Sequence, residues 1–342
     1  MRAYNTDRYI GEAIKSFLSQ TYENKELVIV EDCSPDNTAK IAAKFASKFD
    51  GIYFTDECRA TKNAGAGKTF VKIAKIVLSR ARPDDIIYVL DDDDKYLRDD
   101  ALELLVSRML KTRADVCFVD SENFGDVGLV SLDERKRNQA MIIDELSKLD
   151  KAKTIAQLNI IAKAHCGMCT RAYTANVFKR YIDLIPELTD QHVIGDDIMS
   201  LSSLLLRGLA FTSLAEPIYG YRRRGDSISK KFSRGFFLKN MLFLRTAKDM
   251  VLHYPECHVV EARRYLKDML DIFRRDYVDR VAIETKRGRL ENYSKTELLE
   301  DFYTVVGNVD AEVSLKSNVI SFPSHVKKIA SIAGVASFIS AI

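Results

Sequence analysis

Hydrophobic and polar positions follow two different periods along the first half of the chain. Apolar residues spaced three and four apart predict amphipathic helices at about 10–18, 41–45, 70–78 and 102–110. Short runs of β-branched and aromatic residues between these helices predict strands at 26–30, 52–54, 86–90 and 116–119. Strands that alternate with helices in this way are typical of an α/β protein, with a mostly parallel sheet and helices on both faces.

The second half of the chain has a different pattern. An apolar-polar segment at 165–170 predicts one more strand. Beyond about residue 233 only helical patterns remain, and the last of them begins after Ser294-x-x-Glu297, which has the form of a capping box. We therefore expect a first domain at 1–232 and a helical C-terminal appendage at 233–342.

Composition narrows the class of protein. The chain has 342 residues, of which 30% are charged and 46% hydrophobic, as expected of a globular, water-soluble protein. Its 52 basic and 49 acidic residues leave a net charge of only +3, which does not favour a nucleic-acid partner. Six cysteines are too few for a disulfide scaffold, and residues 1–9 lack the apolar core of a signal peptide. These features predict reduced thiols and a cytoplasmic location.

No run of about 18 uninterrupted apolar residues occurs, so the sequence predicts no transmembrane helix. The last segment, 326–342, is apolar and rich in small residues, and Lys327 and Lys328 stand at its head. Such a segment could lie on the inner face of the plasma membrane as a peripheral contact. The alternative is a terminal helix packed on the rest of the C-terminal region.

Four consecutive aspartates, Asp91 to Asp94, directly follow the predicted strand at 86–90. Carboxylates crowded together repel one another unless a cation neutralises them. Open α/β sheets bind ligands at the carboxyl ends of their strands, and magnesium-class ions prefer carboxylate oxygens. The run therefore indicates a site for a metal–nucleotide complex. The alternative is a solvated acidic turn that caps the next helix.

Two further motifs are less specific. Cys166-x-x-Cys169, beside His165, has the spacing of half a zinc site, but no second pair of ligands follows at a suitable distance, so we expect buried thiols. The segment 65–69, Gly-Ala-Gly-Lys-Thr, is similar to the end of a P-loop. Lys62 stands where the first glycine of that motif belongs, and a polar segment rather than a strand precedes it. A P-loop NTPase is therefore the weaker interpretation.

A series of motifs in the first 232 residues occurs in one order and spacing. They are Tyr4-Asn5, Ser16-x-x-x-Gln20-Thr21-Tyr22, Glu31-Asp32-x-Ser34-x-Asp36, Asn63-x-Gly65, the aspartate run, Gly195-Asp196-Asp197, Glu216-Pro217-Ile218-Tyr219-Gly220-Tyr221-Arg222 and Asp226-Ser227. With these motifs the chain resembles family 2 glycosyltransferases. The resemblance implies a Rossmann-like GT-A fold and an inverting transfer from a nucleotide-diphosphate sugar, assisted by a divalent metal.

The same resemblance implies roles for single residues at the donor site. Asp32 would accept a hydrogen bond from the base, most often uracil, and Tyr4 would lie against the nucleotide. Asp91 and Asp93 match the two acids that bind Mn²⁺ or Mg²⁺, and Asp93 is favoured as the direct ligand. A cation bound there would stabilise the charge that develops on the leaving diphosphate.

Asp196 matches the catalytic base of the family, with Asp197 as the alternative. The acceptor hydroxyl must lose a proton as it attacks, and a carboxylate on the opposite face of the sugar can take it. Other matching positions are expected to contact the substrate; they are Asn63, Arg222, Arg223 and Ser227. The arginines could bind phosphate oxygens when their loop closes, or they could form an exposed basic turn.

Only Met1-Arg2-Ala3 precede Tyr4, where the family has its first apolar strand, so we expect that strand to be missing or truncated. The sequence thus predicts a metal-dependent hexosyltransferase of polysaccharide biosynthesis. Its donor would be a UDP-sugar and its acceptor a glycan or a lipid-linked sugar. The alternatives are the P-loop NTPase and a catalytically impaired GT-A protein that only binds the sugar nucleotide.

Overall fold

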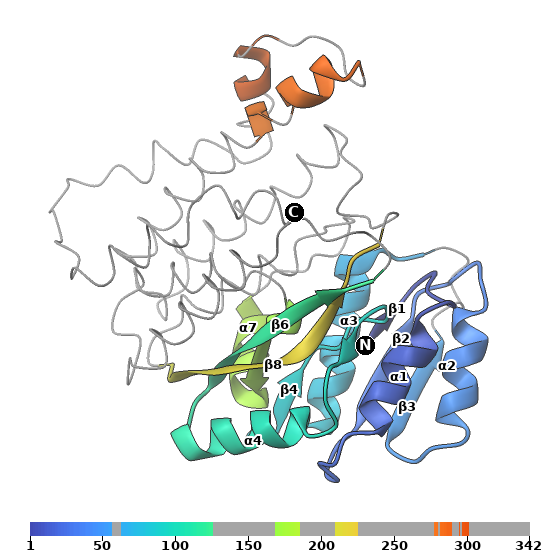
Figure 1. Cartoon of the computed structure of the whole chain (residues 1–342), viewed down its shortest axis with the longest axis vertical. Helices are drawn as coiled ribbons and strands as arrows, with labels where there is room; N and C mark the ends of the chain where they lie inside the picture. The colour runs from blue at the N-terminus through green and yellow to red at the C-terminus, as the bar shows by residue number, and fades with distance from the viewer. Residues whose placement is uncertain are drawn as a thin grey trace, which may run out of the picture. The chain divides into compact units, whose positions relative to one another are not determined.

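The computed structural model describes residues 1–56, 63–125, 168–184 and 209–224, and the short segments 277–279, 281–288, 294 and 296–300. The described residues up to Arg224 belong to one compact unit, and those from Tyr277 onward belong to another. The first unit contains the two sheets and the helices that pack on them (Figure 1).

Three parallel strands form the first sheet, in the order β1-β2-β3. They are β1 (Arg2–Ala3), β2 (Leu27–Glu31) and β3 (Ile52–Asp56). All five residues of β2 are buried, as its continuous apolar run predicts. The first strand, expected to be missing or truncated, is present: β1 has two residues, which pair with Val30 and Glu31 of β2. The carboxyl end of β2 is therefore covered rather than left as an open edge.

The second sheet has the strand order β4-β7-β6-β8-β5. Its strands are β4 (Ile86–Tyr88), β5 (Lys95–Tyr96), β6 (Val116–Phe124), β7 (Arg171–Thr174) and β8 (Phe211–Arg222). Only β6 and β8 pair in parallel here, whereas the other three pairs are antiparallel. Parallel pairing thus prevails in the first sheet alone.

The strand expected at 165–170 begins later in the chain. Met168–Thr170 form a short 3₁₀ helix, η1, and the strand β7 starts at Arg171. Residues 165–167 lie outside the described part. The shift is one of boundaries, since η1 leads directly into β7.

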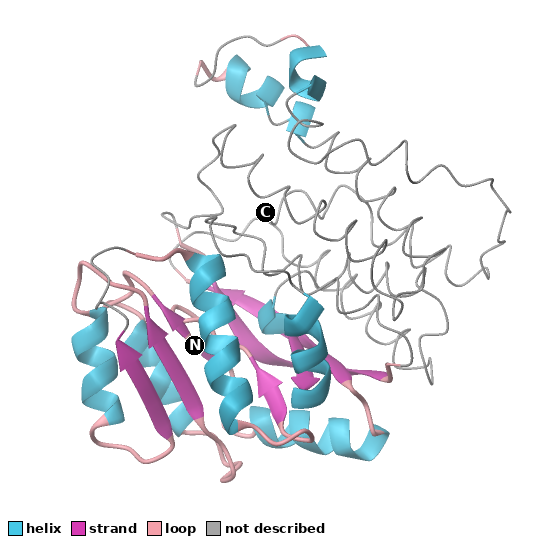
Figure 2. Ribbon diagram, turned by 180° about the vertical axis from the view of Figure 1, so that it is seen from behind, coloured by secondary structure: helices cyan, strands magenta, loops and turns pink. Residues whose placement is uncertain are grey.

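Helices cover both faces of the sheets, as the alternating pattern predicts. They are α1 (Ile10–Leu18), α2 (Thr38–Ala46), α3 (Ala66–Arg80), α4 (Ala101–Thr112) and α7 (Ala175–Leu184). In Figure 1 α1 lies in front of the strands, while Figure 2 shows α3 on the opposite side. The predicted apolar face of α1 is buried, with Ile10, Ile14 and Phe17 in the core.

The core of the first unit ends where the aspartate run begins. Leu90 is buried among side chains from α1, β2 and α4, including Ile14, Ile29 and Leu105. Because a fully buried leucine fixes the chain at that point, the loop that begins at Asp91 starts from a defined place. The packing therefore positions the loop that carries the candidate chemistry.

The predicted capping box is confirmed in the second unit. The Ser294 backbone N–H donates to Glu297 Oε2 at 2.7 Å, and the Glu297 N–H donates to Ser294 Oγ at 3.2 Å. Residues 296–300 are helical after this cap, and Leu298 is buried. Within the described segments, none of the helices combines the length and the apolar character needed to cross a bilayer.

Candidate active site

The aspartate loop is anchored first through Asp92. Its Oδ2 accepts hydrogen bonds from the Tyr4 backbone N–H at 2.8 Å and from the Thr6 hydroxyl at 2.6 Å. These bonds join the loop after β4 to the segment between β1 and α1. Burial raises the pKa of Asp92 to about 7, and the neighbouring Asp93 adds to the rise. Asp92 therefore binds a proton more readily than an exposed aspartate does.

The second anchor of the loop is Asp94, whose side chain is almost completely buried. Its Oδ2 accepts from the Tyr219 hydroxyl at 2.7 Å, and its Oδ1 accepts from the Arg222 backbone N–H at 2.7 Å. Burial and the nearby aspartates raise the pKa of Asp94 well above its ordinary value. Asp94 thus ties the loop to β8, and a fully solvated acidic turn does not describe this segment.

Asp91 and Asp93 keep access to solvent, with side chains 27% and 20% exposed. Asp91 Oδ1 lies 3.5 Å from Arg2 Nη2, and Asp93 Oδ2 lies 3.0 Å from Arg224 Nε. Burial raises the pKa of Asp93 above its ordinary value, although Arg224 opposes the rise. The two predicted metal ligands therefore differ from Asp92 in their contacts. Asp92 accepts hydrogen bonds from the β1–α1 segment, whereas Asp91 and Asp93 each face an arginine.

A different set of ligand atoms comes closer together. One oxygen each of Asp91 and Asp94 and the sulfur of Cys169 lie within 4.8 Å of one another. Both Asp94 oxygens already accept hydrogen bonds, and a thiolate is a poor ligand for magnesium-class ions. This set of three atoms therefore does not suit a hard divalent cation. Cys169 is a buried thiol, as predicted, while the rest of the cysteine motif lies outside the described residues.

Asp32 fastens the glycine turn that precedes α3. Its Oδ1 accepts from the Ala64 N–H at 2.8 Å and its Oδ2 from the Gly65 N–H at 3.0 Å, and Gly65 has a φ of 90°. An ionised carboxylate can accept about four hydrogen bonds, so these two leave acceptor capacity for a base. Asn63, the first residue of this turn, is half-buried, and Tyr4 is exposed. The structure thus brings three predicted donor-site residues to the ends of β1 and β2.

Glu31, the first residue of its motif, stabilises the turn that follows β2. Its side chain is completely buried and accepts from the backbone N–H groups of Cys33, at 3.0 Å, and Ser34, at 2.6 Å. Cys33 adopts a φ of 60°, and the two hydrogen bonds hold the turn in that conformation. Glu31 therefore shapes the loop that carries Asp32.

Arg222 is not part of an exposed basic turn. Its side chain is 9% exposed, its Nε donates to the Asp93 carbonyl at 2.6 Å, and its Nη2 donates to the Glu12 carboxylate. The guanidinium also lies over the rings of Tyr9 and Phe124, at 4.7 and 4.3 Å. The guanidinium can be buried because these hydrogen-bond partners and rings take the place of water around it. In the structure as described, Arg222 holds the aspartate loop.

Arg223 is half-buried, and its Nε donates to Asn123 Oδ1 at 3.1 Å. The remaining predicted site residues, Asp196, Asp197 and Ser227, lie outside the described residues. Sequence reasoning singled out neither Thr6 nor Tyr219 as part of the loop's support. Tyr219 belongs to the motif at 216–222, but nothing in the sequence shows that its hydroxyl donates to Asp94.

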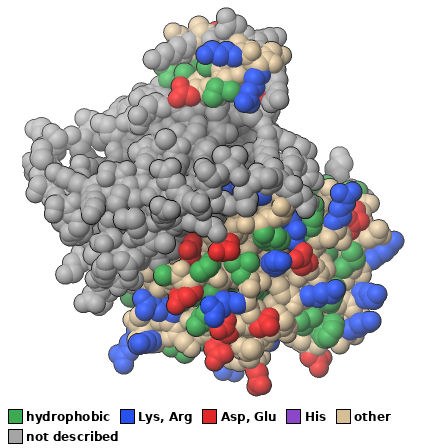
Figure 3. Space-filling model, viewed as in Figure 1, with side chains coloured by type: hydrophobic (Ala, Val, Ile, Leu, Met, Phe, Trp, Pro, Cys, Tyr) green, Lys and Arg blue, Asp and Glu red, His purple; other side chains and the backbone are tan. Residues whose placement is uncertain are grey.

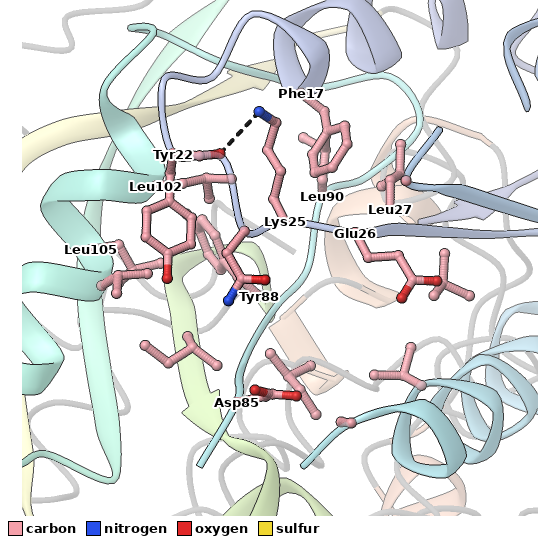
Figure 4. Close-up of a pocket in the computed structure, with 18 of the residues that line it drawn as sticks. Phe17, Tyr22, Lys25, Glu26, Leu27, Asp85, Tyr88, Leu90, Leu102 and Leu105 are labelled. Atoms are coloured by element: carbon pink, nitrogen blue, oxygen red, sulfur yellow. Dashed lines mark hydrogen bonds between the residues drawn. The ribbon is translucent and has the colours of Figure 1, made fainter. Parts of the chain in front are cut away.

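The first unit also has a cavity of about 680 Å³ (Figure 4). It is lined by Leu27 and Ile86, the first residues of β2 and β4, and by Leu105 of α4, together with polar groups such as Lys25. The lining extends along β4 to Leu90, the residue before Asp91. It includes none of the predicted site residues, and we do not assign the donor to this cavity.

Acidic and basic side chains are intermingled on the described part of the face that Figure 3 shows. At the glycine turn the Thr69 hydroxyl donates to the Gly65 carbonyl at 3.1 Å within the first turn of α3. Lys62, which stands where a P-loop has its first glycine, lies outside the described residues.

Comparison with known proteins gives distant bacterial relatives. "Glycosyltransferase GlyA" of Streptococcus pneumoniae is 23% identical over 235 residues, which are 66% of this chain and 30% of that protein. "UDP-Glc:alpha-D-GlcNAc-diphosphoundecaprenol beta-1,3-glucosyltransferase WfgD" of Escherichia coli is 29% identical over 130 residues, 38% of this chain and 47% of that protein. The matches thus span less than half the length of these curated relatives.

Among solved structures, that of Staphylococcus aureus TarS 1–349 in complex with UDP-GlcNAc superimposes with a TM-score of 0.62. The alignment covers 99% of this chain and 86% of that one at 17% identity, and it shows the GT-A fold. Residues 1–179, just over half of the 342, match the sequence model of the family described as "Glycosyl transferase family 2". That segment includes the β1–α1 connection, the glycine turn and the aspartate loop, and the chain belongs to glycosyl transferase family 2.

Proposed function

We propose that the chain is an inverting glycosyltransferase that transfers a sugar from a UDP-sugar to a glycan or lipid-linked acceptor. The observation that carries the proposal is the loop after β4, where Asp91 and Asp93 keep solvent access while Asp92 joins the loop to Tyr4 in a family 2 scaffold. The TarS structure with UDP-GlcNAc supports a UDP-linked donor, and the name of WfgD supports a diphosphoundecaprenol-linked acceptor.

Asp91 and Asp93 would hold the divalent metal. When bound, Mn²⁺ or Mg²⁺ supplies Lewis-acid stabilisation of the charge on the departing diphosphate. The donor set fits such an ion, since both residues offer carboxylate oxygens and remain accessible. Asp92 and Asp94 contribute by fixing the backbone between them, because their oxygens are bonded to the scaffold.

The other residues would orient the donor and move the proton. Asp32 would bind the base with its remaining acceptor capacity, and Tyr4, Asn63, Arg223 and Ser227 would contact the nucleotide sugar. Asp196, with Asp197 as the alternative, would take the proton from the acceptor hydroxyl. Arg222 would act through the loop that it holds rather than by direct phosphate binding.

We also propose a domain organisation and a location for the protein. A catalytic domain at 1–232 would be followed by a helical region at 233–342, in a cytoplasmic protein of polysaccharide biosynthesis. The apolar segment 326–342 would give a peripheral contact at the inner face of the plasma membrane. Binding of the full chain to anionic vesicles, lost on deletion of this segment, tests that contact.

A thermal-shift panel of nucleotide sugars, with and without Mn²⁺, tests the donor and the metal together. UDP at a hundredfold excess over its Kd should raise the unfolding midpoint by about 2–5 °C, and only when Mn²⁺ is present. Asp93→Ala should erase this shift, whereas Asp50→Ala, at an exposed aspartate after α2, should retain it. A metal-dependent shift that persists in Asp93→Ala refutes the ligand assignment.

Transfer itself is tested by release of UDP from the donor that gives the largest shift. Asp196→Asn should abolish UDP release and leave Mn²⁺-dependent UDP binding within about twofold of the wild type. The same result for Asp197→Asn alone would assign the base to Asp197. A wild-type chain that binds donors and never releases UDP, with any glycan acceptor, would instead indicate the impaired, binding-only protein.

A further inference from the structure

Each of the two proposed ligand carboxylates faces an arginine. Arg2 Nη2 lies 3.5 Å from Asp91 Oδ1, and Arg224 Nε lies 3.0 Å from Asp93 Oδ2. The side chains of these arginines are 20% and 16% exposed, so both pairs are only partly screened by water. Two guanidinium charges thus offset the two carboxylate charges that a divalent cation would need.

Aromatic rings hold both arginines beside the loop. The guanidinium carbon of Arg2 lies 5.7 Å from the centroid of the Phe70 ring in α3, and that of Arg224 lies 5.3 Å from the Tyr9 ring. A planar guanidinium that stacks on a ring keeps its orientation better than a lysine ammonium would. The positive charges are therefore fixed near the carboxylates instead of moving freely in solvent.

We propose that Arg2 is the resident counter-ion of Asp91 and transfers to the diphosphate of the donor when a metal–nucleotide complex binds. The inference rests on the proposed function, because it takes Asp91 as a metal ligand. A cation bound by Asp91 would lie close to Arg2, and the two positive charges repel each other. The guanidinium then needs another anion, and the fork of a guanidinium matches phosphate oxygens.

The exchange makes cation and nucleotide binding depend on each other. Without nucleotide, Arg2 competes with the metal for Asp91, so the free cation binds weakly. With nucleotide, the diphosphate takes over Arg2 and leaves Asp91 to the metal. By linkage the cation must raise the affinity for the nucleotide by the same factor. Arg2 is thereby a further residue of the donor site, contributed by β1.

Titration of the full chain with Mn²⁺, followed by the electron paramagnetic resonance signal of the free ion, tests the proposal. The Mn²⁺ Kd is measured with and without saturating UDP, and the ratio of the two values is the coupling factor. In Arg2→Met the Mn²⁺ affinity without UDP should rise about tenfold, and the coupling factor should fall by about the same amount. Arg2→Lys keeps the charge and should keep the weak binding of Mn²⁺ alone.

Arg98→Met is the matched control, because it removes an arginine–aspartate pair, Arg98 with Asp100, at the start of α4. It should leave both Mn²⁺ affinities within twofold of the wild type. Arg2→Gln repeats the test with a polar side chain if Arg2→Met loses its native circular dichroism spectrum. Arg2 variants that match the wild type within twofold overturn this inference alone. A wild-type chain that binds neither Mn²⁺ nor UDP contradicts the proposed function as well.

Discussion

The Tyr219 hydroxyl donates a 2.7 Å hydrogen bond to Asp94 Oδ2 across 125 positions of the chain. The same hydroxyl accepts from the Asp91 backbone N–H at 3.1 Å, so one side chain of β8 contacts both ends of the aspartate loop. Tyr219 is 0% and Asp94 1% exposed. Because water cannot replace these partners, the position of the loop depends on the Tyr219 hydroxyl.

Tyr219→Phe should therefore lower the free energy of unfolding by about 1–3 kcal/mol, since Asp94 Oδ2 and the Asp91 N–H both lose their hydrogen bond to the hydroxyl. Urea denaturation measures the loss, and the Mn²⁺-dependent thermal shift by UDP should become smaller as well. The control is Tyr53→Phe, at an exposed tyrosine whose ring stacks with Arg80 and keeps that stacking without the hydroxyl. It should change the stability by less than about 0.5 kcal/mol. A Tyr219→Phe protein as stable as this control would contradict the argument.

Glu12 should make a pH-dependent contribution to stability. Its hydrogen bond from Lys95 at 2.7 Å, together with Arg222, holds the pKa of Glu12 below its ordinary value of 4.5. The unfolded chain then binds the proton more readily, so the contribution is present above pH 4.5 and is lost as the pH falls through the lower, folded-state pKa. The difference in unfolding free energy between the wild type and Glu12→Gln should shrink from pH 7 to pH 3.5.

Solvent screens this pair, because the Glu12 side chain is 45% exposed, so the difference at pH 7 should also shrink in 1 M NaCl. A double-mutant cycle with Lys95→Met isolates the pair itself. The effects of the two substitutions should be less than additive at pH 7 and closer to additive at pH 3.5. A difference that is constant over this range, or additivity at both pH values, would show that the ion pair contributes nothing.

Local patterns predicted much of the fold, because the spacing of apolar residues within a helix or a buried strand reflects which of its faces are buried. The apolar face of α1, the buried run of β2 and the cap at Ser294 all follow from neighbouring residues. The two-residue strands β1 and β5 are too short to show a periodic pattern. Their existence depends on partners in β2 and β8, which only the folded chain brings together.

The candidate site was predicted as a set of residues but not as an arrangement. Four like residues in a row gave no sign that Asp92 and Asp94 bind the scaffold while Asp91 and Asp93 face arginines. Those roles come from contacts far apart in the sequence, such as Asp94 with Tyr219. Arg222 was expected to reach phosphate or solvent because arginine is rarely buried, and its burial depends on Glu12 and two rings that meet it only in the fold.

Asp32→Asn should loosen the turn before α3 and weaken UDP binding. The amide has one acceptor oxygen, so either the Ala64 or the Gly65 N–H would face an NH₂ group instead of a carboxylate oxygen. We expect a loss of about 1–3 kcal/mol in unfolding free energy and a UDP Kd raised about tenfold in the presence of Mn²⁺. Asp50→Asn, at an exposed site, should do neither. Unchanged UDP binding in Asp32→Asn would remove Asp32 from the donor site.

Two glycine-to-alanine substitutions should act in opposite directions. A Cβ at Gly220 in β8 would lie 2.9 Å from Leu97 Cδ2 and 3.1 Å from Phe124 Cε1, so Gly220→Ala should cost about 1–3 kcal/mol through overpacking beside the aspartate loop. A Cβ at Gly11 in α1 would meet Ile41 and Phe45 at 3.9 Å, an ordinary contact. Gly11→Ala should therefore stabilise the chain by up to about 1 kcal/mol, because alanine favours the helix. Urea denaturation decides both, and a Gly220→Ala protein as stable as the wild type would mean that the Leu97 and Phe124 side chains can shift to make room for the methyl group.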